Sequence, residues 1–191
     1  MIKNFDKKVL GAAIRIGAKS GVENVSTVKL AKLCKISEAS VFVHYKTKKN
    51  LLAKAYIAVD NKLGDVFSGL DFDESDLPSS VERMWALGVD YFLANPNEAR
   101  YYDGFRHSPL FDVEKQPELV GRYPALREYL ENSEVLKGYT PTMIQVVWSF
   151  VLEASLNYIG NVIDGKIEDT DENRKLVFRL IFESILTQEK Q

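Results

Sequence analysis

The stretch from Ser26 to Lys49, STVKLAKLCKISEASVFVHYKTKK, constrains the fold of this chain more than any other part. Ser26 and Ser37 are each suitable N-caps for a short helix. Only Cys34-Lys35-Ile36 connects the two helices, so the chain has to turn sharply between them. The apolar residues that we expect on one face of the first helix are Val28, Leu30, Ala31 and Leu33. This pattern is typical of a helix-turn-helix, whose second helix enters the major groove of DNA.

The second helix of this unit, Glu38 to His44, has few residues that have to be buried. Val41 and Tyr45 are four residues apart and predict the inward face. Small and hydrogen-bonding groups predominate among the others, which suits a DNA groove. The residues that we expect to face outward or sideways are Glu38, Ala39, Ser40, Phe42, Val43 and His44.

The charges around this unit give a second, independent indication. Thr47 is a suitable cap for a third helix that opens with Lys48 and Lys49. Cations in a first helical turn oppose the helix dipole by about 0.3–1 kcal/mol each, so the pair favours an anion at this position, although two solvated lysines are the alternative. Through Tyr56 the chain carries twelve basic and three acidic residues, a net +9, and the remainder carries −11 because the whole chain is −2. A basic head on an acidic body is typical of a DNA-binding protein.

The same stretch resembles the N-terminal motif of the TetR family of transcriptional repressors. The matching residues, at the family's spacing and without gaps, are Gly21, Ser26-Thr27, Leu30-Ala31, Ser37, Phe42, Tyr45 and Lys48. The motif covers about a fifth to a quarter of the chain. Two positions depart from it, because Lys35 stands where the turn usually has glycine and Phe42 stands at a common tyrosine position. A left-handed Lys35 would cost about 1 kcal/mol.

The resemblance implies an all-α protein that regulates transcription. The protein would be a repressor that a small molecule releases from a palindromic operator. Residues 1–46 would form a three-helix DNA-binding head, and residues 47–191 a ligand-binding and dimerisation domain that begins with a connecting helix over 47–69. We expect Ser40, Val43 and His44 to meet base edges, with Val43 against a thymine methyl group. The expected DNA-binding set is Ser26, Thr27, Lys29, Glu38, Ala39, Ser40, Phe42, Val43, His44, Tyr45 and Lys48, in which Ser26, Thr27, Tyr45 and Lys48 hold phosphates.

Helical periodicity continues through the rest of the chain, and we find no strand pattern, repeat or low-complexity segment. The expected helices are 4–20 in the head, 48–69, 77–94, 97–107, 125–137, 140–163 and 171–188. The helix over 140–163 is apolar on nearly every side, which predicts burial on every side. The last helix has one apolar face more than its own domain needs, which indicates a partner chain. The resemblance implies that this partner is a second copy, so that the last two helices of each chain pair in a homodimer. The expected interface residues are Val177, Ile181, Phe182 and Ile185.

Polar residues recur every four positions in the apolar helix, namely Gln145, Ser149, Glu153 and Asn157. A buried row of this kind requires partners, so it either pairs across the dimer or faces a cavity. In the second case an aromatic or amphipathic ligand would bind there, although most aromatic residues at helical spacing are core. The candidate ligand-binding residues are Trp85, Tyr102, Phe105, Trp148, Glu153 and Asn157. The alternative is a regulator whose body only dimerises or binds a protein partner, with no small-molecule inducer.

Other function classes find little support. Asp90, His107 and Glu153 have no spacing that ties them into a catalytic site, and there is no phosphate-binding glycine loop, so we expect no enzyme and no cofactor. Cys34 is the single cysteine, which excludes an intrachain disulfide and a zinc cluster, and we expect a packed thiol rather than a redox sensor. No signal peptide opens the chain and no apolar run reaches about 18 residues, which predicts a cytoplasmic protein without a membrane segment.

Overall fold

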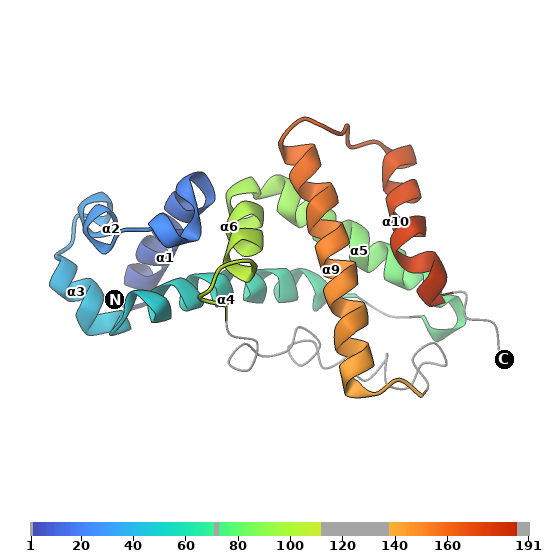
Figure 1. The fold of residues 1–191 in the computed structure, drawn as a ribbon, viewed down its shortest axis with the longest axis horizontal. Coiled ribbons are helices and arrows are strands. Elements are labelled where there is room, and N and C mark those ends of the chain that lie inside the picture. The colour runs from blue at the N-terminus through green and yellow to red at the C-terminus, as the bar shows by residue number, and fades with distance from the viewer. Residues whose placement is uncertain (1, 71–72, 112–137, 187–191) are drawn as a thin grey trace. The chain divides into compact units, whose positions relative to one another are not determined.

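The computed structural model describes residues 2–70, 73–111 and 138–186, and these ranges contain helices and no strand (Figure 1). The expected all-α fold is confirmed. The elements are α1 (Ile2–Ser20), η1 (Val22–Asn24), α2 (Thr27–Cys34), α3 (Glu38–Tyr45), α4 (Lys48–Phe67), η2 (Glu74–Asp76), α5 (Leu77–Ala94), α6 (Pro96–Arg106), α9 (Pro141–Ile163) and α10 (Asp171–Leu186). The helix expected over 125–137 lies outside the described residues.

Hydroxyl side chains cap the helices where the sequence predicted them. Ser26 Oγ accepts a hydrogen bond from the Lys29 amide, and Ser37 Oγ accepts one from the Ser40 amide at 3.1 Å. Thr47 Oγ1 accepts from the Asn50 amide at 3.0 Å. Each bond satisfies an amide that the first turn of a helix leaves without a backbone partner, which is why these helices begin where they do.

Two lysines that end helices have positive φ angles. Lys35, in the turn between α2 and α3 where the resembling motif usually has glycine, is left-handed with φ 51° and ψ 48°. Lys46, between α3 and α4, has φ 68° and ψ −48°, and the Thr47 amide donates to the Tyr45 carbonyl at 2.8 Å across it. That is a γ-turn with positive φ, which is rare and strained for a residue with a side chain. The strain lies on both sides of α3.

The chain divides into two compact units, residues 1–63 with 95–116, and residues 64–94 with 117–191. In the first unit α6 packs against α1, so α6 is grouped with the predicted three-helix head. The contact is close because Gly17 has no side chain: a Cβ there would lie 2.6 Å from the ring of Tyr101. Tyr101 also donates its hydroxyl to the Leu52 carbonyl at 2.9 Å, which ties α6 to α4.

An aromatic cluster fills the rest of the first unit. Tyr56 of α4 stacks on Tyr102 and Phe105 of α6, with ring centroids 4.6 and 5.0 Å away. Tyr102 donates its hydroxyl to the buried carboxyl group of Asp60 at 2.9 Å. Burial of the phenol raises the pKa of Tyr102, so it remains a hydrogen-bond donor.

In the second unit α5, α9 and α10 pack together. Trp85 of α5 donates its indole N–H to Ser155 of α9 at 3.0 Å, and its ring lies 5.8 Å from that of Phe178 on α10. Arg174 makes two hydrogen bonds to the Asp169 carboxylate, at 2.8 and 2.7 Å, and an ion pair with Asp90 at 2.7 Å. These bonds fix the start of α10 against the connection from α9 and against α5.

The prediction that α9 is buried on every side is wrong for the single chain. Gln145, Ser149 and Asn157 of the polar row are exposed, and the apolar Val146 and Phe150 are exposed as well. The exposed polar row can therefore be satisfied by water and does not require a cavity. Contrary to the expectation from the sequence, residues 142–163 are long and apolar enough to cross a membrane by length and composition alone, although core helices of soluble proteins meet the same criteria.

Candidate DNA-binding interface

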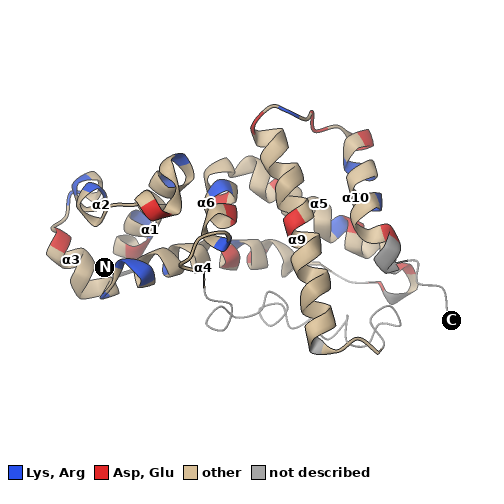
Figure 2. Cartoon of the chain, viewed as in Figure 1, with Lys and Arg blue, Asp and Glu red and all other residues tan. Residues whose placement is uncertain are grey.

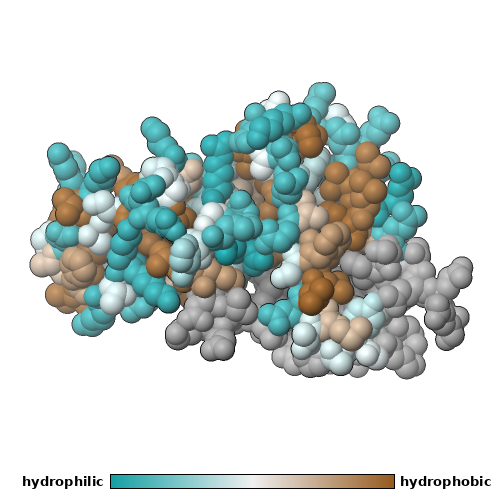
Figure 3. Space-filling model, viewed as in Figure 1, coloured by the Kyte–Doolittle hydropathy of each residue, from teal (hydrophilic) through white to brown (hydrophobic). Residues whose placement is uncertain are grey.

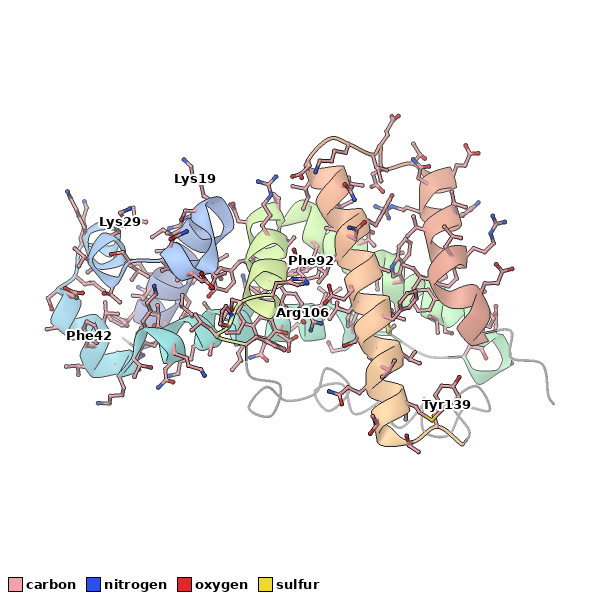
Figure 4. All side chains as sticks on the ribbon, in the orientation of Figure 1. Lys19, Lys29, Phe42, Phe92, Arg106 and Tyr139 are labelled. Atoms are coloured by element: carbon pink, nitrogen blue, oxygen red, sulfur yellow. The ribbon has the colours of Figure 1, made fainter. Side chains whose placement is uncertain are left out.

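The recognition helix α3 is anchored by two residues and exposes the others. Val41 and Tyr45 are buried on its inner side, as the sequence predicted. On its outer side Val43 is 71% exposed and Phe42 is exposed too (Figure 4). Ala39 is also exposed, whereas Ser40 and His44 are half-buried. Apolar side chains held in water on a short, well-anchored helix are a surface suited to a partner.

Contacts between α2 and α3 fix the angle of the helix-turn-helix. Thr27 of α2 donates its hydroxyl to the Glu38 carboxylate of α3 at 2.6 Å. The predicted roles of Thr27 and Glu38 toward DNA therefore compete with a bond between the two helices. Ser26 is occupied as the cap of α2, and Lys29 beside it extends into solvent (Figure 4).

Tyr45 requires a correction. It was predicted to hold a phosphate, but its side chain is only 2% exposed and its hydroxyl donates to Asp6 Oδ1 of α1 at 2.6 Å. Burial, together with the bond to Asp6, raises the pKa of Tyr45 and keeps the phenol protonated. Tyr45 therefore supports α3 from behind and does not face a phosphate. His44 Nε2 lies 2.8 Å from the same Asp6 oxygen.

Lysines surround the exposed face of the head. Figure 2 shows Lys and Arg on α1, on α2 and at the start of α4. Lys48 donates from Nζ to the Glu23 carbonyl at 2.6 Å, which fastens η1 to α4 and leaves two ammonium hydrogens for other acceptors. Its predicted bond to a phosphate stays a prediction.

Comparisons with known proteins agree with this arrangement. No family model and no curated protein matches the sequence. Among solved structures, a TetR family transcription regulator from Marinobacter aquaeolei VT8 is 24% identical, with a TM-score of 0.76 over 96% of this chain and 98% of that one. This chain has the TetR-family fold.

Two further structures support the TetR assignment of the fold. A putative TetR family transcription regulator from Shewanella sp. PV-4 is 17% identical, with a TM-score of 0.80 over 94% of this chain and 96% of that one. NalD of Pseudomonas aeruginosa, described as the secondary repressor of the MexAB-OprM multidrug efflux pump, is 16% identical, with a TM-score of 0.64 over 95% of each chain. The first two proteins are described as transcription regulators and NalD as a repressor.

A second exposed surface lies on α9 and α10, where apolar residues gather (Figure 3). Its members are Met143, Val146, Phe150, Leu176 and Leu180. The predicted interface residues Ile181 and Phe182 are buried within their own chain, and Val177 is half-buried. The side chain of Ile185 lies outside the described ones. The extra apolar face of α10 therefore consists of Leu176 and Leu180, one turn apart, and Ile181 and Phe182 belong to the core of the second unit.

The candidate ligand residues are not brought together within either unit. Tyr102 and Phe105 are fully buried in the first unit, while Trp85, Trp148, Glu153 and Asn157 belong to the second. Trp85 is a core residue bonded to Ser155, and Asn157 is exposed. Trp148 differs from them because its indole N–H is buried without a hydrogen-bond partner among the residues that the structure describes.

Two residues of the head that contact α3 were not predicted from the sequence. Asp6 and Phe5 contact the end of α3 from a position nearly forty residues away in the chain, and no local pattern reports such a contact. Val28 and Leu33 were expected on the inner face of α2 but are exposed. The buried residues of α2 are Leu30, Ala31 and Cys34 instead. Their helical spacing places these three side chains on one narrow face of the helix.

Proposed function

We propose that this protein is a sequence-specific DNA-binding regulator of transcription. The exposed outer side of α3, with Val43 in water in an N-terminal region, residues 1–56, of net charge +9, carries the proposal. Val43 would gain free energy by burial against an apolar group, and the thymine methyl group is the apolar feature of the major groove. The surrounding lysines supply the phosphate contacts that give affinity without sequence preference. The TetR fold, shared with regulators of transcription, supports the same function.

The test is selection of binding sites from random-sequence DNA by the full chain. The expected product is a short palindrome with two half-sites about one helical turn, or a multiple of it, apart. Val43→Ala serves as the variant, because it removes the expected methyl contact without touching a buried residue. It should relax the preference for thymine at one position of each half-site. Ile167→Ala is the control, because Ile167 is an exposed apolar residue in the connection from α9 to α10 and lies outside α3 and outside the apolar rows of α9 and α10. Selection without any enriched sequence would disprove the proposal.

The palindrome is expected because we also propose that the protein is a homodimer. Met143, Val146, Phe150, Leu176 and Leu180 form apolar rows along α9 and α10, and a second copy presenting the same surface would cover them. The acidic remainder of the chain makes this surface unsuited to DNA. Because DNA is the proposed partner, we also propose that the protein is cytoplasmic.

We further propose that the protein is a repressor and that a small aromatic or amphipathic molecule releases it from DNA. Repression is supported by the fold shared with NalD, which is described as a repressor. The ligand is supported by Trp148, whose buried indole N–H lacks a partner among the described residues and would gain one from an acceptor on the ligand. A compound library screened by thermal shift should yield compounds that also weaken DNA binding. Trp148→Phe, which removes the N–H and keeps the ring, should reduce both effects.

A further inference from the structure

Asp6 of α1 joins the first helix of the head to the end of the recognition helix. Its Oδ1 atom accepts the Tyr45 hydroxyl at 2.6 Å and lies 2.8 Å from His44 Nε2. Both partners are on α3, 38 and 39 residues further along the chain. A single carboxylate oxygen therefore holds two successive side chains of the helix that faces the proposed DNA site.

This carboxylate determines which nitrogen of His44 carries the proton. Burial alone would raise the pKa of Asp6, but the hydrogen bonds from Tyr45 and His44 outweigh burial and the pKa is lowered. Asp6 is therefore ionised at neutral pH and only accepts hydrogen bonds. His44 Nε2, at hydrogen-bond distance from it, has to carry a hydrogen. In the neutral ring the other nitrogen, Nδ1, is then an acceptor and cannot donate.

Neighbouring rings restrict the position of the His44 ring. The Phe5 ring lies 5.0 Å from that of His44, and the Tyr45 ring meets it edge-on at 4.6 Å. From α4, the ammonium group of Lys54 lies 5.5 Å from the centre of the Tyr45 ring and acts on the charge of Asp6. Lys54 thereby favours the ionised form of Asp6. The His44 side chain nevertheless stays 28% exposed, beside Val43.

We propose that Asp6 is a positioning residue for base recognition: it holds His44 as the Nε2–H tautomer, so that Nδ1 accepts a hydrogen bond from the exocyclic amino group of an adenine or a cytosine. Those amino groups are the base donors of the major groove, whereas guanine O6 and N7 only accept. The inference rests on the proposed DNA-binding function. It assigns the base preference at one position of each half-site to a residue outside the helix-turn-helix.

The first experiment needs no DNA. Long-range ¹H–¹⁵N correlation spectra of the full chain at pH 8 report which ring nitrogen is protonated. The chain has only two histidines, so His107→Gln identifies the His44 signals. We expect Nε2 of His44 to be protonated and Nδ1 to be bare, with Asp6→Asn shifting the signals toward those of a mixture of tautomers. A proton on Nδ1 in the unaltered protein would overturn the inference, and because DNA is absent this failure is distinct from a failure of the proposed function.

The second experiment uses the DNA duplex recovered by selection. Replacing each adenine by purine, or each cytosine by pyrimidin-2-one, removes one exocyclic amino group at a time. At one position of each half-site the loss of affinity should be about five- to tenfold for the unaltered protein and absent for Asp6→Asn. Tyr45→Phe is the control, because it removes the other hydrogen bond to Asp6 and leaves His44 in place, so it should retain the base preference. If Asp6→Asn weakens binding to every duplex alike, or not at all, Asp6 has no role in base recognition.

Discussion

Two surfaces of this protein expose large apolar side chains, and they differ in what surrounds those side chains. On α3 the exposed Phe42 and Val43 lie in an N-terminal region, residues 1–56, of net charge +9, and the polar cluster of Asp6, His44 and Tyr45 lies behind them. On α9 and α10 the exposed residues form apolar rows in a part of the chain that is acidic. Exposure alone does not identify a partner. The charge around it separates a surface suited to DNA from one suited to a second copy of the chain.

The sharpest test of the second surface uses two adjacent residues of α10. Ile181 is 3% exposed and Leu180 is 66% exposed. Ile181→Glu places an unpaired carboxylate in the core and should lower the free energy of unfolding by about 3 kcal/mol or more. Leu180→Glu should leave the monomer folded and weaken self-association at least about a hundredfold, because the same charge would be buried only in the dimer. Chemical denaturation and sedimentation velocity measure the two effects.

The control for that pair is Lys175→Glu, which changes the charge of the same helix at an exposed position that is not apolar. It should affect neither unfolding nor association by more than about 0.5 kcal/mol. If Leu180→Glu remained as dimeric as Lys175→Glu, the apolar rows of α9 and α10 would not form the interface between copies.

A second pair of variants compares the interior of the head with the exposed helix α9. A Cβ at Gly17 would lie 2.6 Å from the Tyr101 ring, whereas a Cβ at Gly160 has nothing within 4 Å. Gly17→Ala should therefore destabilise the protein by about 1–3 kcal/mol through overpacking between α1 and α6. Gly160→Ala should stabilise it by about 0.5–1 kcal/mol, because alanine favours a helix. Equal Tm changes for the two would mean that α1 and α6 are not in close contact.

The smallest of these effects concerns the turn before the recognition helix. Lys35 has φ 51°, where glycine is free of strain and lysine is not. Lys35→Gly should raise the free energy of unfolding by up to about 1 kcal/mol. Lys32→Gly, three residues earlier inside α2, loses the same charge but should be destabilising by about 1 kcal/mol. A destabilising Lys35→Gly would show that the turn is not left-handed in solution.

Local signals in the sequence were sufficient for the helices and the turn. Ser26, Ser37 and Thr47 cap the helices that they were predicted to cap, since an N-cap bond spans only three residues. Contacts over long sequence separations were not predictable. No motif around Asp6 indicates its contact with His44. The close contact of α1 with α6 depends on Gly17, but the local backbone at this position does not require glycine.

The sequence also did not predict which apolar residues of α9 and α10 are buried within their own chain. The apolar period of α9 and α10 shows that these helices have more apolar surface than one face needs, but it does not show which part its own chain covers. Ile181 and Leu180 are equally apolar neighbours, and only the packing of α10 against α5 and α9 distinguishes them. Ile181 and Phe182 were therefore predicted for the interface, whereas the structure buries both and exposes Leu176 and Leu180.

The central claim is that the basic head binds DNA through α3 and its flanking lysines, and the salt dependence of binding tests it most directly. The affinity for the selected duplex should fall with salt concentration along a linear double-logarithmic plot. Lys48→Ala should weaken binding to all sequences alike and reduce the slope by about one, while Lys175→Ala, with the same charge change on α10, should leave the slope unaltered. An affinity that does not depend on salt, or a Lys48→Ala variant that changes which sequence is preferred, would contradict the account.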